Sequence, residues 1–380
     1  MLIENDIYGD KWIEMKNDDR NSEGNKPRKK SKALSVFIKL VAAVLGLAVG
    51  FSLYWIYIFG GTFVAVPVVS REDYSPVDIT VSGSAAGGDV VSPWKDGGHT
   101  RLFYDPSHPI IEVKQKDPEV ENILVFGIDS RGTDDYECRT DSIMVVSVNK
   151  RFKSVKVISL MRDTGVYLGD TEETLGSNLN KLNTAYHFGG VGLMINTINI
   201  TFGLDIQRFV MFDFSSAANL IDLCGGVDIE IKAEELTYAN KYLDEMYQLD
   251  GNTSPHLNRV GLQTLDGHQA VAWTRIRYLD SDFVRASRQR TVATSLMKKV
   301  SGMSYASKLQ LLNDSAGVFE TNMKSVDIMR VAFDCFECLD NLEEKRIPED
   351  GLFTVQNDPW MMNIDFATQK QFLNDFIWGE

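Results

Sequence analysis

A long stretch without charge near the N-terminus most constrains how this chain can fold. No charged residue lies between Lys39 and Arg71, and the first part of this stretch is almost wholly apolar. A helix of about 20 apolar residues, each rising about 1.5 Å, is long enough to cross a bilayer. Trp55 and Tyr57 lie toward its far end, where interfacial aromatic residues are typical. Residues 40–66 are therefore predicted to form a single transmembrane helix.

The residues before this stretch carry concentrated positive charge. Six Lys and Arg residues, and no acidic residue, occur from Lys26 to Lys39. The positive-inside rule then makes residues 1–39 a basic cytoplasmic tail and places the C-terminal part outside the cytoplasm. The predicted location is the cell membrane, with one span. The alternative is a cleaved signal peptide, but such a peptide begins close to the N-terminus and has a shorter apolar core.

The remaining chain divides by composition. Residues 67–115 include a segment rich in Ser, Gly, Pro and Asp, and are predicted to form an extracytoplasmic stalk. Residues 116–300 alternate between apolar runs and amphipathic segments, and are predicted to form the main folded domain. Residues 301–380 are expected to be a C-terminal helical extension packed on or beside that domain. A separate small domain is the alternative there.

Hydrophobic periodicity predicts a mixture of strands and helices. Strands are expected at 122–129, 142–149, 154–161, 208–214, 227–231 and 275–278. Helices are expected at 189–202, 215–223 with Ser215 as its N-cap, 265–273, 282–300 and 329–342. This mixture predicts an α/β fold in which helices cover the faces of a sheet.

The charge balance limits the possible partners. The net charge is −14 and the pI is near 4.9, so a general nucleic-acid partner is not expected. A phosphate ligand must then bind in a local cationic pocket. The four cysteines are too few for a disulfide framework, and the single Cys335-x-x-Cys338 motif is a weak metal or redox signal.

A first group of charged residues follows three predicted strands. Asp129 comes directly after the first, and Asp141 lies just before the second. Two carboxylates at neighbouring strand ends can hold one hard cation, and Mg²⁺ prefers a few carboxylates together with phosphate oxygens. Arg162 follows the third strand and can bind a phosphate with two parallel hydrogen bonds.

A second group lies far downstream. Arg275 and Arg277 are predicted to share one face of a strand, because side chains alternate there with a period of two. Arg285, Arg288 and Gln289 share one face of the following helix at spacings of three and four residues. A solvated salt bridge is the usual role of any single arginine. Several arginines near strand ends and a helix N-terminus together predict a diphosphate site.

The order of motifs resembles the LytR-CpsA-Psr family over roughly residues 120–300. The matching segments are ILVFGIDSR, RTDSIMVVSVN, VISLMRDT, KLNTAY, VMFDFSSAANLIDLCGGVDIEI, LDGHQAVAWTRIRY and the RxxRQ run that ends at Gln289. Each segment alone is weak, but the set in this order behind an N-terminal anchor is specific.

This resemblance implies an α/β/α sandwich around a central mixed β-sheet. It also implies a cell-wall phosphotransferase that takes a glycopolymer, such as a teichoic acid or capsular polysaccharide, from an undecaprenyl-diphosphate carrier. The polymer is joined to peptidoglycan through a phosphodiester, with Mg²⁺ as cofactor.

The resemblance also assigns roles to residues. Asp129 and Asp141 match metal-linked acids. Catalytic roles are implied for Asp129, Asp141, Arg162, Arg275, Arg277 and Arg285. Substrate contacts are expected from Arg131, Arg139, Asp163, Lys181, Asp282, Arg288 and Gln289. Val284 departs from the family, where many members have glycine.

The lipid tail requires an apolar groove, and six residues are candidates to line it: Leu193, Ile195, Ile198, Phe212, Phe214 and Leu220. Two other functions remain open. One is a polyprenyl-diphosphate hydrolase, in which water replaces the sugar acceptor. The other is a non-catalytic, membrane-anchored envelope regulator or lipid-binding protein.

Overall fold

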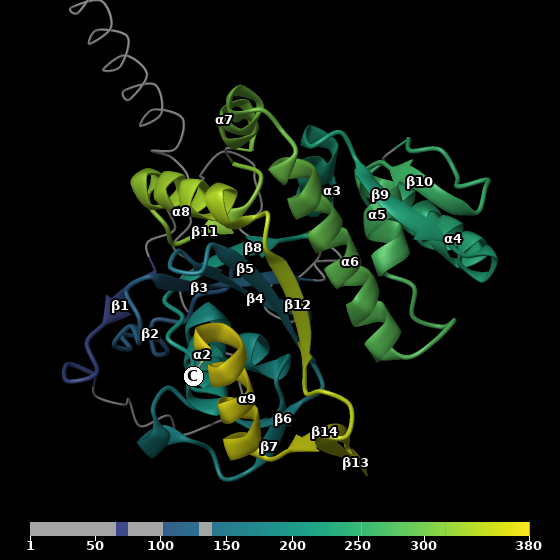
Figure 1. Ribbon diagram of the computed structural model, residues 1–380. Coiled ribbons are helices and arrows are strands. Elements are labelled where there is room, and N and C mark those ends of the chain that lie inside the picture. The colour runs from purple at the N-terminus through teal and green to yellow at the C-terminus, as the bar shows by residue number, and fades with distance from the viewer. Residues whose placement is uncertain (1–65, 75–101, 129–138, 252, 316, 380) are drawn as a thin grey trace, which may run out of the picture. The chain divides into compact units, whose positions relative to one another are not determined.

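A central mixed sheet organises the part of the chain that the structure describes. This computed structural model describes residues 66–74, 102–128, 139–251, 253–315 and 317–379. Within these ranges the central sheet has six strands in the order β11-β8-β3-β4-β5-β12 (Figure 1). β3 pairs parallel to β8 and antiparallel to β4, and β5 pairs antiparallel to β4 and parallel to β12. The prediction of a mixed α/β fold around a central mixed sheet is confirmed.

The strands of the central sheet are β3 (Val120–Ile128), β4 (Thr140–Asn149), β5 (Ser154–Leu160), β8 (Arg208–Phe212), β11 (Glu320–Thr321) and β12 (Leu342–Ile347). The smaller pairs are β1 (Val68–Val69) with β2 (Ile110–Ile111), β6 (Gly165–Tyr167) with β7 (Leu179–Lys181), β9 (Val227–Ile231) with β10 (Gly261–Leu265), and β13 (Phe353–Asn357) with β14 (Trp360–Ile364).

The helices are α2 (Thr184–Phe202), α3 (Phe214–Leu223), α4 (Ala233–Asp250), α5 (Gly267–Thr274), α6 (Asp282–Ser301), α7 (Tyr305–Asp314), α8 (Ser325–Cys338) and α9 (Phe366–Trp378). A short 3₁₀ turn spans Glu172–Thr174. The N-cap of α3 is Asp213, whose carboxylate accepts from the backbone amide of Ser216, so the prediction of Ser215 as the cap is wrong by two residues.

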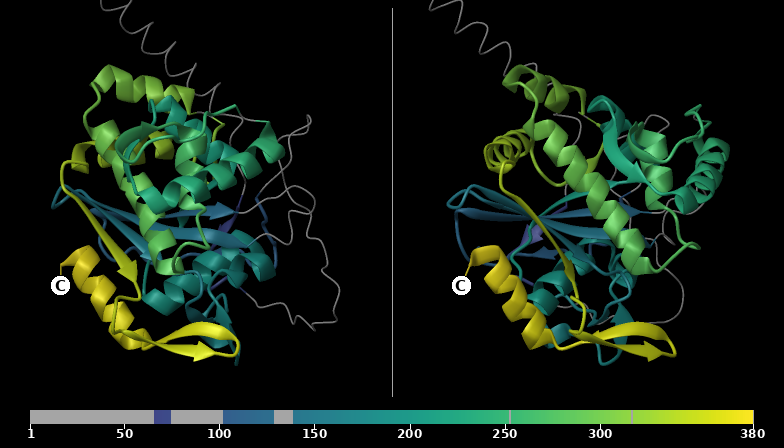
Figure 2. Two further views of the ribbon diagram at one scale, coloured as in Figure 1. Left: turned by 90° about the vertical axis from the view of Figure 1, so that its right-hand side faces the viewer. Right: turned by 45° about the vertical axis from the view of Figure 1, so that its right-hand side comes forward.

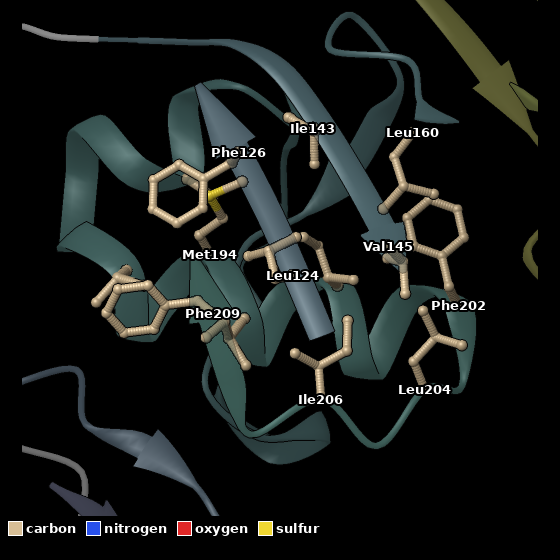
Figure 3. Packing of buried hydrophobic residues seen from close by; sticks show 14 of the residues in the cluster. Leu124, Phe126, Ile143, Val145, Leu160, Met194, Phe202, Leu204, Ile206 and Phe209 are labelled. Atoms are coloured by element: carbon tan, nitrogen blue, oxygen red, sulfur yellow. The ribbon is translucent and has the colours of Figure 1, made fainter. Parts of the chain in front are cut away.

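Alternation along the strands separates two apolar layers. Leu124 and Phe126 of β3 point into the core beneath α2 and α9, where Figure 3 shows them beside Met194 and Phe209. Val125 points to the opposite face, because successive side chains of a strand alternate. The different views agree that α2 and α9 cover one face and that α6 and α8 lie over the other (Figure 2).

The C-terminal 80 residues contribute directly to this architecture. β12 lies at one edge of the central sheet and β11 lies at the other. Sequence reasoning described this region only through its helix, because β12 reads Leu-Glu-Glu-Lys-Arg-Ile and lacks an apolar run. A charged edge strand is a common protection against edge-to-edge aggregation, and it hides the strand from hydrophobicity patterns.

No helix among the described residues is long and apolar enough to cross a membrane. The predicted span, residues 40–66, lies outside those residues except for Val66. Three cysteines are described, and all three are free thiols. Burial is the main cause that raises the pKa of Cys335 to about 12, so its thiolate is strongly disfavoured. The Cys-x-x-Cys motif is thus a poor nucleophile in this fold.

A buried polar network around Asp170 joins His108, which lies just before β2, to Asn196 of α2. Asp170 accepts from the Tyr74 hydroxyl at 3.0 Å and from the Asn196 amide at 2.7 Å, and it lies 2.6 Å from the Nδ1 of His108. Burial opposes the charged form of His108. The hydrogen bond and charge of Asp170, with the charge of Asp105, outweigh burial and raise the pKa of His108.

This raised pKa predicts a pH dependence of stability. A histidine with a raised folded-state pKa stabilises the protein fully below its unfolded pKa, about 6.5. The contribution is lost as the pH rises through the folded-state pKa of His108. For the wild type, the free energy of unfolding measured with urea is expected to be lower at about pH 8.5 than at about pH 5.5. His108→Gln should make this difference smaller. An equal loss in both proteins would contradict this origin.

Candidate diphosphate site and apolar cavity

Residues from distant segments meet where the central strands end, at one end of the sheet. Asp141 lies at the start of β4, and Arg162 follows the end of β5. These positions are adjacent because β4 and β5 are antiparallel, with Met144 opposite Ser159. The carboxyl ends of β3 and β8 reach this same end of the strands, because β3 runs antiparallel to β4 and β8 runs parallel to β3.

Arg162 is the centre of this cluster. Its guanidinium donates to Asp141 at 2.6 Å, to Asp282 at 2.9 Å and to Asp163 at 3.2 Å. Burial opposes the charge of Arg162, but the three carboxylates outweigh it and raise its pKa. Because Asp282 lies 120 residues downstream, the predicted convergence of the two distant groups is present in the fold.

Each carboxylate around Arg162 has a second cationic partner. Arg277 donates to the other oxygen of Asp141. The Lys181 ammonium lies 2.8 Å from Asp163, and the Arg285 guanidinium lies 3.5 Å from Asp282. Burial raises the pKa of Asp282, but Arg285 and Arg162 outweigh it and hold that pKa below its usual range. The site is therefore a network in which cations and carboxylates alternate.

Arg285 has hydrogen-bond donors that this cluster does not use. It is 3% exposed, and its Nε and Nη1 have no hydrogen-bond partner among the described residues. Burial first, and then repulsion from Arg162, lower the pKa of Arg285 despite the nearby carboxylates. A buried cation with unsatisfied donors is costly unless an anion completes it. The neighbouring Val284 is 37% exposed, so the departure from the family glycine lies on the solvent side of the helix.

Arg275 and Arg277 do not share a strand face, and the prediction of a strand at 275–278 is wrong. Arg275 is the C-cap of α5 and has helical backbone angles. The helix ends at Thr274, one residue beyond its predicted end. Arg277 reaches Asp141, whereas the guanidinium of Arg275 lies 4.4 Å from the ring centroid of Phe214 and 3.5 Å from Glu245.

The remaining candidates are spread more widely. Arg288 is buried and paired with Glu235 at 2.9 Å and with Asp280, so its charge is already matched by the protein. Gln289 lines the cavity described below. Arg139 is exposed and lies directly before β4. Asp129 and Arg131 lie outside the described residues.

An apolar cavity of about 380 Å³ opens beside this cluster. It lies between the sheet face that carries Val125 and Val210 and the helices α3, α5 and α6. Asp141, Ser142, Asp213, Thr274 and Gln289 are its polar lining residues. Phe214, whose ring contacts the guanidinium of Arg275, also lines it. An apolar chamber with a charged end suits an amphiphile with an anionic head.

The six residues expected to line the lipid groove fall on both sides of the sheet. Phe212, Phe214 and Leu220 line the cavity, as predicted. Leu193, Ile195 and Ile198 do not, because α2 buries them against the opposite layer. Hydrophobicity identifies all six as residues that face an apolar environment but does not indicate which sheet face each helix covers.

Sequence reasoning missed Ser142 as a site residue. It lies next to Asp141, and its hydroxyl is buried without a hydrogen-bond partner among the described residues. The alternation of side chains along β4 could have identified it, because Ser142 and Met144 point to the same face of the strand. Both residues line the cavity.

Filling the cavity is expected to separate lipid binding from phosphate binding. Ala217 lines the cavity from α3, so Ala217→Trp places an indole where an apolar chain would lie. The affinity for a polyprenyl diphosphate should fall about tenfold or more, while that for inorganic pyrophosphate is retained. Isothermal titration measures both, with Ala306→Trp at an exposed position of α7 as control. Unchanged lipid affinity would contradict the assignment of the cavity.

Asp141 is the described residue of the expected metal site. No group of three His, Cys, Asp or Glu side chains suited to a metal ion occurs in the described ranges. Both oxygens of Asp141 accept from guanidiniums, but each keeps a further lone pair. Oxygen donors of this kind suit Mg²⁺, so Asp141 fits the expected ion in its chemistry.

The fold and the site define an α/β protein with an arginine-rich cluster beside an apolar cavity. The chain matches the LytR_cpsA_psr family model over residues 99–374 and belongs to the LytR-CpsA-Psr family.

Its relatives include two named transferases from Bacillus species. Polyisoprenyl-teichoic acid–peptidoglycan teichoic acid transferase TagU of Bacillus anthracis is 31% identical over 282 residues, which cover 73% of this chain and 84% of that protein. The corresponding transferase TagV of Bacillus subtilis is 28% identical over 218 residues, covering 57% of this chain and 52% of that protein.

Solved structures share the fold. TagT bound to LIIa-WTA has a TM-score of 0.55 and 21% identity, covering 70% of this chain and 94% of that one. The LytR-CPS2A-psr family protein YwtF (TagT) with bound octaprenyl pyrophosphate lipid has a TM-score of 0.51 and 20% identity, covering 70% and 93%.

Proposed function

We propose that this chain transfers a glycopolymer from an undecaprenyl-diphosphate carrier to peptidoglycan through a phosphodiester. The observation that carries this proposal is Arg285, a buried guanidinium with two unused donors, in a cluster that borders an apolar cavity. The names of TagU and TagV, which are teichoic acid transferases, support the same reaction. The bound octaprenyl pyrophosphate in the TagT structure supports the class of lipid.

The residues suggest how the reaction proceeds. Arg162 and Arg285 hold the diphosphate and neutralise charge that develops on the leaving phosphate, which is most of the catalysis in phosphoryl transfer. A sugar hydroxyl of peptidoglycan attacks the phosphorus that carries the polymer. A new P–O bond forms, the bond to the bridging oxygen breaks, and undecaprenyl phosphate leaves.

The hydroxyl proton requires an acceptor near Arg162. Asp163 and Asp282 both accept hydrogen bonds from Arg162. We propose Asp163 or Asp282 as the general base, because both carboxylates lie beside Arg162.

Two further features belong to this proposal. Asp141, with Asp129 outside the described residues, would hold Mg²⁺, which supplies positive charge to the phosphate oxygens when bound. Residues 40–66 would anchor the chain in the cell membrane, with the N-terminus cytoplasmic and the catalytic domain on the side where peptidoglycan lies.

A reconstituted transfer assay tests this function against its alternatives. The full chain in detergent is incubated with an undecaprenyl-diphosphate-linked glycopolymer, Mg²⁺ and peptidoglycan. We expect polymer attached to peptidoglycan and release of undecaprenyl phosphate that depends on the acceptor. Equal release without peptidoglycan would identify a hydrolase, and binding without turnover would identify a non-catalytic protein.

A further inference from the structure

The β13–β14 hairpin is fixed against both segments that carry the anion site. The backbone amide of Met362 donates to the carbonyl of Asp163 at 3.0 Å, next to Arg162. Phe353 packs on Phe283 in the first turn of α6, with ring centroids 5.6 Å apart. Figure 1 shows the hairpin near the N-terminal end of α6. The hairpin therefore has a defined position relative to the site, although it lies near the C-terminus.

Trp360 is the exposed aromatic residue of this hairpin. It begins β14 and is 37% exposed, whereas the next two residues, Met361 and Met362, are buried. The Lys181 ammonium lies 5.7 Å from the centroid of the Trp360 ring. The same ammonium lies 2.8 Å from Asp163, which in turn contacts Arg162. Two side chains thus connect Trp360 to the centre of the cluster.

Single exposed apolar residues are common and need no function, so the position of Trp360 carries the argument. In the proposed reaction both sugars are close to the reacting phosphorus, because one is bonded to it and the hydroxyl of the other attacks it. A pyranose ring has an apolar C–H face and a polar rim of hydroxyls. An indole matches that face, and an adjacent ammonium with a carboxylate matches the rim.

We propose that Trp360 and Lys181 form a sugar-binding subsite for a pyranose ring next to the diphosphate. This inference rests on the proposed function and adds a specificity-determining residue to it. The sugar has two possible sources, the first residue of the donor polymer and the acceptor residue of peptidoglycan. Both present the same chemistry to Trp360, and binding measurements distinguish them.

Three probes test the subsite with the full chain in detergent. They are a sugar-free polyprenyl diphosphate, the same lipid carrying one N-acetylglucosamine, and a soluble peptidoglycan oligosaccharide. Trp360→Ala is expected to weaken binding of one glycan probe about tenfold, which corresponds to about 1.4 kcal/mol. Trp360→Phe should retain most of the affinity because it keeps an aromatic face. The affected probe identifies the source of the sugar.

A matched control removes an aromatic ring far from the site. Phe152 is 57% exposed in the turn that joins β4 to β5, at the end of these strands opposite Asp141 and Arg162. Phe152→Ala should leave all three affinities unchanged. Both glycan affinities remaining at the wild-type value in Trp360→Ala would overturn the subsite. An equal loss for the sugar-free lipid would also overturn it, by giving Trp360 a supporting role.

The outcome for the wild type separates this inference from the proposed function. Wild-type protein that binds the sugar-free lipid but neither glycan probe would overturn the subsite alone. Wild-type protein that does not bind the sugar-free lipid would contradict the proposed function itself.

Discussion

Arg162→Ala is expected to slow glycopolymer transfer about a thousandfold while the chain remains folded. Arg162 donates to three carboxylates, so its loss removes the charge at the centre of the site. Each of those carboxylates keeps another cation, because Asp141 retains Arg277 and Asp163 retains Lys181. The fold therefore survives a change that removes transition-state stabilisation.

Single-turnover kinetics and thermal unfolding measure the two parts of this prediction. Arg162→Lys should recover only part of the rate, since an ammonium cannot make the parallel hydrogen bonds of a guanidinium. Arg151→Ala is the control, because Arg151 is exposed and pairs with Asp117 away from the site. A rate for Arg162→Ala within a few-fold of wild type would remove Arg162 from the mechanism.

Arg285→Met is expected to make the protein more stable and unable to bind the diphosphate well. Methionine fills a similar volume without placing an incompletely matched charge in the interior, so unfolding should require about 1–3 kcal/mol more. Affinity for a polyprenyl diphosphate should fall about a hundredfold, because two charge-assisted hydrogen bonds are lost. Denaturant unfolding and isothermal titration measure these opposite effects.

Arg288→Met provides a control on the same helix. Arg288 and Arg285 are each 3% exposed, but Arg288 is paired with Glu235 and Asp280. Removing it leaves a buried carboxylate without its partner, which should cost about 3–5 kcal/mol. If Arg285→Met were destabilised as much as Arg288→Met, the description of Arg285 as an unsatisfied cation would be wrong.

The interior of the fold was largely predictable because its strands are apolar and alternate. β3, β4 and β5 were predicted with bounds within a few residues of the observed ones, since their side chains face two buried layers. β12 was missed because its charged sequence suits a sheet edge. Local patterns do not reveal which strands become neighbours, and β12 becomes the partner of β5 only through tertiary contacts.

The site was predictable in its residues but less so in its geometry. Resemblance and motif order indicated Arg162, Arg277, Arg285 and Asp141, and the fold brings these four together. The pattern could not show that Arg288 is neutralised by Glu235, because that carboxylate lies on α4, 53 residues away. Trp360 gave no motif signal at all, since its relation to Lys181 exists only in the folded chain.

The central claim is that the unsatisfied guanidinium of Arg285 receives a lipid diphosphate whose tail enters the adjoining cavity. A crystal structure of the full chain with a polyprenyl diphosphate tests it most directly. Phosphate oxygens are expected about 2.8 Å from Nε and Nη1 of Arg285, with the first isoprene units between Val125, Val210 and Leu220. A diphosphate bound elsewhere, with Nε and Nη1 of Arg285 still without hydrogen-bond partners and the cavity empty, would contradict the account.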